Sequence, residues 1–70
     1  MDKRHELIEL GLKIRAIRIS KGFTQMELAY RIGKDHPSIN RLEKGKINPN
    51  YIFLLEICEG LEVKIEEIFK

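Results

Sequence analysis

The sequence has one cysteine, few aromatic residues and no long apolar run. Cys58 is the only cysteine among the 70 residues, so neither an internal disulfide nor a cysteine-based metal cluster can form. The absence of a run of about 18 apolar residues argues against a membrane-spanning helix. The first ten residues carry both charges and lack the apolar stretch of a signal peptide. We therefore expect a protein of the reducing cytoplasm.

The sequence also lacks the residue patterns of an enzyme. His5 and His36 lie far apart, and neither has a carboxylate at a spacing typical of metal ligands. There is no glycine-rich phosphate loop, and Ser20 and Ser38 have no plausible partners for a catalytic triad. We expect no catalytic residue, no metal site and no cofactor.

The size and composition predict one small soluble domain. The chain is 43% apolar and 34% charged, which is ordinary for a soluble helical protein. Repeats, linkers and low-complexity segments are absent, so residues 1–70 are expected to form a single unit. A chain of this length buries only about 60% of its unfolded surface, so every helix is needed to enclose the core.

The charge is distributed unevenly along the chain. The net charge is +2, which alone says little about partners. Residues 1–46 hold eleven Lys and Arg against six Asp and Glu, or +5, whereas residues 47–70 hold two against five, or −3. The first part could attract phosphate while the second avoids it. A solvated surface with an accidental asymmetry is the alternative explanation.

The apolar spacing predicts an all-α fold of five helices without strands. The first helix should end at about Lys21 with Leu10, Ile14 and Ile17 facing inward, although Gly11 weakens the prediction of one continuous helix. Asp2 is a candidate cap for its start. The second and third helices lie in residues 24–45. The fourth is expected at Tyr51 to about Gly60, capped by Asn50, with Leu54, Leu55, Cys58 and Leu61 facing the core, and the fifth at Ile65 to Phe69.

Residues 24–45 have the pattern of two short helices joined by a tight turn. Thr24 and Glu27 form a capping box, and Gly33 can end the first helix with a positive φ. Asp35 is a suitable N-cap for the second helix. Ile39 and Leu42 should then face inward. Such a pair of helices exposes the start of its second helix, which is the geometry that reads a DNA major groove.

This segment resembles the helix-turn-helix of phage Cro and C1-type repressors, the XRE family. The matching positions are Gln25, Ala29, Gly33, Ile39, Leu42, Glu43 and Gly45, with Asn48-Pro49 and the ending LEVKIEEIF in support. The resemblance covers about residues 11–69. It implies a compact five-helix, lambda-repressor-like DNA-binding domain. The chain departs from the family pattern at Glu62, where Gly or Asn is usual, and at Lys64, where Ser, Thr or Asp usually caps the last helix.

The resemblance and the chemistry of the side chains give candidate DNA contacts of two kinds. Arg41 can bind guanine O6 and N7, and Asn40 can bind adenine N6 and N7. With His36 and Pro37 they are the candidates for base reading. The candidates for phosphate binding are Gln25, Ser38, Lys44 and Lys46.

The resemblance also implies a partly buried ion pair between Arg18 and Glu43 that orients the third helix. A domain of this kind usually binds DNA as a dimer, and Ile52 and Phe53 are the candidate dimer contacts. Ile8, Leu12 and Ile19 form a second apolar set, which could pack on the C-terminal helices or face a partner.

We therefore expect a sequence-specific transcriptional regulator that binds double-stranded DNA as a homodimer at an inverted repeat. Controller proteins of restriction–modification systems and lysogeny-type repressors are family members of this size. The alternative is a protein-interaction module, such as an antitoxin, whose main partner is another protein.

Overall fold

The computed structural model describes residues 3–69, which form four α-helices and one 3₁₀ turn without strands. The helices are α1 (Arg4–Ser20), α2 (Gln25–Ile32), α3 (His36–Glu43) and α4 (Tyr51–Leu61), and the 3₁₀ turn η1 spans Ile65–Glu67. The all-α prediction is confirmed. Asp2, the candidate cap of the first helix, lies outside the described residues.

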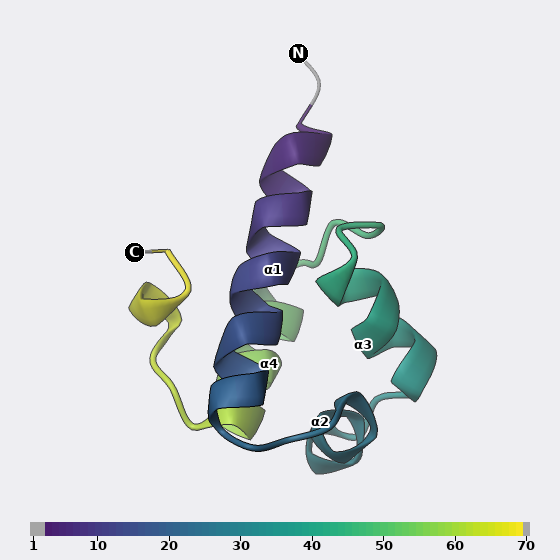
Figure 1. The fold of residues 1–70 in the computed structure, drawn as a ribbon, viewed down its shortest axis with the longest axis vertical. Coiled ribbons are helices and arrows are strands. Elements are labelled where there is room, and N and C mark those ends of the chain that lie inside the picture. Colours follow the sequence, from purple (N-terminus) through teal and green to yellow (C-terminus); the bar gives the residue numbers. More distant parts are fainter. Residues whose placement is uncertain (1–2, 70) are drawn as a thin grey trace.

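The helices pack around one core (Figure 1). α3 packs on both α1 and α2, and α2 packs on α4. The first turns of α1 project beyond the other helices (Figure 1). The side chains that are almost completely buried are Ile14, Leu28, Ile39, Leu42, Ile57 and Leu61. Within residues 3–69, no helix combines the length and apolar character needed to span a membrane.

The predicted signals at the ends of α2 and α4 are present. Thr24 Oγ1 accepts a hydrogen bond from the Glu27 amide at 3.0 Å, and Glu27 Oε1 accepts one from the Thr24 amide at 2.8 Å. Gly33 ends α2 with φ 70°. Asn50 caps α4 by accepting a hydrogen bond from the Phe53 amide at 2.8 Å. These caps satisfy donors that the first turn of a helix leaves free.

Gly11 lies within a continuous α1 and permits a close contact with α3. A Cβ atom at this position would overlap the carbonyl oxygen of Glu43 and lie 2.6 Å from that of Leu42. Gly45, with φ 72°, would similarly meet the backbone of Ile8 at 2.6 Å. The doubt that Gly11 raised about α1 was therefore unfounded, because this glycine serves helix packing.

Two details of the C-terminal part differ from expectation. The predicted fifth helix, Ile65 to Phe69, is only the 3₁₀ turn Ile65–Glu67. In α4, Ile57 is fully buried, whereas Leu55, predicted to face the core, is half-buried. The error in α4 falls in an apolar run that fits more than one helical register. The segment after it is short, and 3₁₀ geometry is common in pieces of about three or four residues.

The two departures from the family pattern have local compensation. Glu62 adopts φ 60°, a conformation that favours glycine, and its carboxylate accepts a hydrogen bond from Arg31 Nη2 at 3.0 Å. Arg31 Nε also donates to the Gly60 carbonyl, near the end of α4, at 2.9 Å. At η1, the Glu67 carboxylate accepts a hydrogen bond from the Lys64 amide at 2.9 Å. The side chain of this cap interaction therefore belongs to the last residue of the turn and not to Lys64.

Candidate nucleic-acid interface

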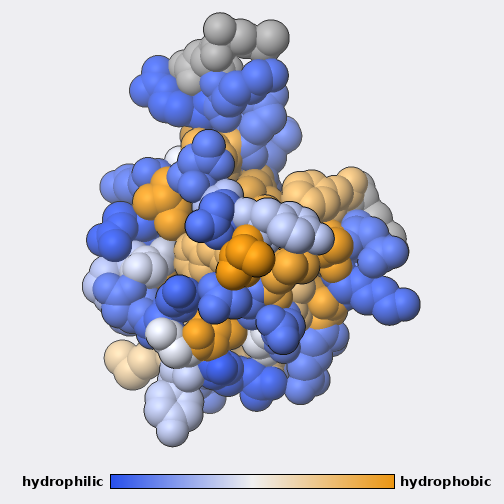
Figure 2. All heavy atoms as spheres, turned by 180° about the vertical axis from the view of Figure 1, so that it is seen from behind, coloured by the Kyte–Doolittle hydropathy of each residue, from blue (hydrophilic) through white to orange (hydrophobic). Residues whose placement is uncertain are grey.

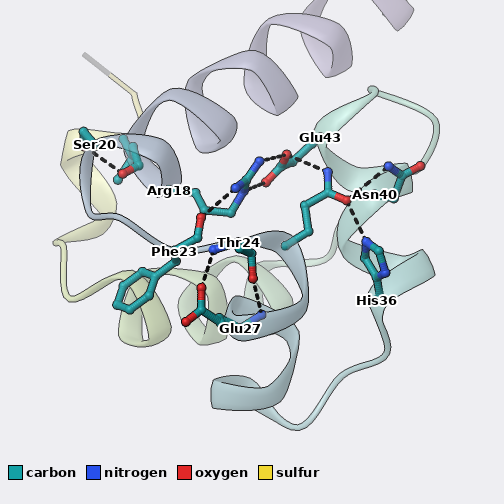
Figure 3. A network of polar contacts seen from close by, with 10 residues as sticks. Arg18, Ser20, Phe23, Thr24, Glu27, His36, Asn40 and Glu43 are labelled. Carbon is teal, nitrogen blue, oxygen red and sulfur yellow. Dashed lines mark hydrogen bonds and ion pairs between the residues drawn. The ribbon is translucent and has the colours of Figure 1, made fainter.

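A buried ion pair joins the last turn of α1 to the end of α3. Arg18 Nε donates to Glu43 Oε2 at 2.6 Å, and Arg18 Nη2 donates to Glu43 Oε1 at 3.0 Å. Arg18 is 8% exposed and Glu43 is 4% exposed. Arg18 Nη1 also donates to the Phe23 carbonyl at 2.7 Å. The sequence reasoning named this pair, and the structure brings the two side chains together in a two-bond geometry (Figure 3).

Gln25 connects this ion pair to the exposed side of α3. Its Nε2 donates to Glu43 Oε1 at 2.9 Å. Its Oε1 lies 2.9 Å from His36 Nε2 and accepts a hydrogen bond from Asn40 Nδ2 at 3.2 Å. Gln25 is the first residue of α2, so its side chain bonds three residues of α3 from the start of the neighbouring helix. We call these five residues, Arg18, Gln25, His36, Asn40 and Glu43, the polar network.

The sequence reasoning missed the contacts of Gln25 within the protein. It assigned this residue to a phosphate only. The available signal was that His36 and Asn40 are four residues apart, and so lie on one face of a helix. The crossing of α2 and α3 places Gln25 opposite that face. No pattern within one helix predicts this crossing.

The four candidate base-reading residues lie on α3 with different exposure. His36, Pro37 and Arg41 are exposed, and Asn40 is half-buried. Pro37 lies in the first turn, where its missing N–H is tolerated. Ile39 and Leu42 fill the opposite, buried face. The helix therefore presents its polar face outward and fixes two members of that face through the polar network.

The candidate phosphate contacts fall at the two ends of the motif. Lys44 and Lys46 are exposed and flank the turn that ends α3. Ser38 is half-buried, and a hydrogen bond with its side chain lowers the pKa of Asp35. A carboxylate beside Ser38 disfavours a phosphate there, so the two lysines are the stronger candidates. Asp35 itself stands at the N-cap position with extended backbone but makes no cap hydrogen bond with its side chain.

The candidate dimer residues Ile52 and Phe53 are not equivalent. Ile52 is 62% exposed. Phe53 is half-buried against the core, and Lys34 Nζ lies 5.6 Å from the centre of its ring. Figure 2 shows hydrophobic side chains gathered over α4, with hydrophilic residues around them. Of the two candidate dimer residues, only Ile52 is therefore largely exposed, because successive positions of a helix point in different directions.

Most of the sequence matches one known protein family. The family model described as "Helix-turn-helix" matches residues 14–68. The chain belongs to this helix-turn-helix family. It has the DNA-binding fold of XRE-type transcriptional regulators, which are not a class of enzymes.

Individual relatives of this helix-turn-helix protein agree with the assignment. An uncharacterized HTH-type transcriptional regulator from Archaeoglobus fulgidus is 39% identical over 57 residues, which is 81% of each chain. The restriction–modification controller protein C.AhdI from Aeromonas hydrophila is 28% identical, with a TM-score of 0.90 over 93% of this chain and 98% of that one. The controller protein C.Esp1396I, solved as a tetramer in complex with its natural 35 base-pair operator, is 35% identical, with a TM-score of 0.79 over 91% of this chain and 95% of that one.

Proposed function

We propose that this protein is a sequence-specific transcriptional regulator that binds duplex DNA as a homodimer at an inverted repeat, with α3 in the major groove. The observation that carries the proposal is the polar network, which fixes His36 and Asn40 on the exposed face of α3. Side chains that are ordered before binding lose less conformational entropy when they meet a base. The solved complex of C.Esp1396I with its operator supports the same use of the fold.

The proposal divides the candidate residues into base reading and phosphate binding. Arg41, His36, Asn40 and Pro37 read base edges from the exposed face of α3. Lys44 and Lys46 bind backbone phosphates beside them. One N–H of the Gln25 amide donates a hydrogen bond to Glu43. The second N–H can therefore donate a hydrogen bond to a phosphate at the N-terminal end of α2.

Dimerisation follows from the size of the reading surface. One recognition helix contacts only a few base pairs, and two helices related by a twofold axis reach successive major grooves about 34–36 Å apart. Ile52 is the contact that we propose for the dimer. Its exposed apolar side chain belongs to α4, which packs on α2, rather than to the reading helix.

Selection of binding sites from random duplex DNA tests the proposal. We expect an inverted repeat, and affinity that falls steeply with salt. Arg41→Ala should relax the preference at one base pair by about 1–3 kcal/mol, whereas Lys44→Ala should weaken all sites alike and reduce the salt slope by about 0.9. Recovery of no preferred sequence by the unmodified protein would overturn the proposal.

A second candidate function is the binding of a protein partner. Its supporting observation is the apolar set on α1, with Ile8 45%, Leu12 56% and Ile19 51% exposed. Leu12→Glu separates the two functions, because it should abolish capture of a partner while leaving the selected DNA site unchanged. Loss of DNA binding by this variant would instead place α1 in the DNA-binding assembly.

A further inference from the structure

The donors and acceptors of the polar network have a fixed direction. Glu43 is paired through both carboxylate oxygens with Arg18, and an ionised carboxylate only accepts hydrogen bonds. The group that Gln25 offers to Glu43 must therefore be its NH₂, and its oxygen must face α3. The buried ion pair thus determines which way round the Gln25 amide lies.

This direction continues to His36. Gln25 Oε1 has only lone pairs to offer, so both of its partners on α3 must donate. Asn40 does so through Nδ2 at 3.2 Å. His36 meets the same oxygen with Nε2 at 2.9 Å, so the proton of the neutral ring must be on Nε2. The other ring nitrogen, Nδ1, then carries a lone pair.

Nδ1 of His36 is directed away from the network. Figure 3 shows the ring with one nitrogen on the dashed line to the network and the other on the far side. Among the described residues, His36 makes no other hydrogen bond, and its side chain is exposed. The first residue of α3 therefore presents a hydrogen-bond acceptor to whatever lies against the helix.

We infer that the Arg18–Glu43 ion pair, acting through Gln25, makes His36 an acceptor at Nδ1, so that His36 selects a base that offers an exocyclic amino group in the major groove. This inference rests on the proposed function. The amino groups available there are N4 of cytosine and N6 of adenine, whereas guanine O6 and N7 and thymine O4 are acceptors and face a lone pair unfavourably. Gln25 is a positioning residue in this scheme, and His36 touches the base.

The tautomer is measured by NMR of the protein labelled with ¹⁵N in its histidine rings. At pH 8, the spectrum should show the proton of the neutral His36 ring on Nε2 only. Exposed histidines commonly favour this tautomer, so the diagnostic variant is Gln25→Lys. A lysine can still pair with Glu43 but has only donors for His36, so the proton should move to Nδ1. An unchanged tautomer in Gln25→Lys overturns the inference, and His5 in the same spectrum is the internal control.

The base contact is tested with modified DNA at the pair where His36→Ala relaxes the selected sequence. Removing the exocyclic amino group there, with purine for adenine or 2-pyrimidinone for cytosine, should weaken binding by roughly three- to tenfold. The same change should not affect His36→Ala. Replacing N7 with carbon at this pair should have no effect on either protein.

The possible failures are distinct. Weaker binding after loss of N7, but not after loss of the amino group, would show that His36 donates and would overturn the inference. So would a His36→Ala protein that relaxes no base pair. Failure of the unmodified protein to select any site would overturn the proposed function instead, while the tautomer measurement would still decide the direction of the network.

Discussion

Two groups of surface side chains in this molecule are held in different ways. On the side where α2 meets α3, the polar residues bond one another in sequence, from Arg18 and Glu43 through Gln25 to His36 and Asn40. Over α1 and α4, exposed apolar side chains such as Leu12 and Ile52 lie largely in solvent. A buried charge pair can thus order a surface for hydrogen bonding, whereas exposed apolar residues offer contact area without a preferred direction.

Loss of the ion pair should produce the largest effect. Arg18→Ala leaves the Glu43 carboxylate buried without its cation, so we expect a loss of about 3–5 kcal/mol in the free energy of unfolding. Arg18→Met with Glu43→Leu should recover much of this stability, because apolar replacement of a buried pair is often neutral or better. Thermal unfolding of both single variants and the double variant measures the coupling.

The double variant also separates stability from recognition. It removes the acceptor that orients Gln25, so sequence preference should remain relaxed even where stability returns. A coupling energy near zero would contradict a structural role for the pair. Recovery of the full preference by the double variant would show that the network does not order the reading surface.

The crossing of α1 and α3 should be the next most sensitive feature. Gly11→Ala places a Cβ atom against two backbone carbonyls of α3, and we expect it to lower the free energy of unfolding by about 1–3 kcal/mol, although alanine favours helices. Ala16→Gly, at an exposed position of the same helix, is the matched control and should cost about 1 kcal/mol through helix propensity alone. A stabilised Gly11→Ala protein would show that α1 does not approach α3 so closely.

Changes to the exposed apolar residues should affect association rather than folding. Ile52→Glu changes a residue that is 62% exposed, so the protein should stay folded but become monomeric and bind its operator weakly. Ile19→Glu, 51% exposed on α1, is the control and should leave the dimer intact. Analytical ultracentrifugation distinguishes them, and an unchanged dimer in Ile52→Glu together with a monomer in Ile19→Glu would move the interface to α1.

The smallest effect is expected at the start of α2. The hydrogen bond from the Thr24 amide lowers the pKa of Glu27 below its usual 4.5, with a further contribution from the Thr24 hydroxyl. A folded-state pKa that is lower than the unfolded value gives stability that is present above the unfolded pKa and is lost as the pH falls through the folded pKa. Glu27→Gln should therefore lower the melting temperature slightly at pH 7, and the difference should shrink below about pH 4. The same difference at both pH values would show that the carboxylate does not accept these bonds in solution.

The sequence best predicted those features that depend only on residues close together in the chain. A capping box needs only Thr24 and Glu27 at the right spacing, and Gly33 ends its helix by its own backbone freedom, so both were predicted correctly. Local patterns were less reliable in the apolar C-terminal part. There Leu55 and Ile57 compete for the core, and the register is decided by contacts with α2 and η1.

The sequence alone determined the all-α class, the motif in residues 24–45, its family resemblance and the residue types on α3, because these depend on spacing along one chain. The tertiary structure decided how those residues act on one another. Only the crossing of the helices makes Gly11 a contact with α3, brings Gln25 to Glu43 18 positions away, and turns its oxygen towards His36. Hydrogen-bond direction is a property of groups that meet in space, and no spacing along a single helix specifies it.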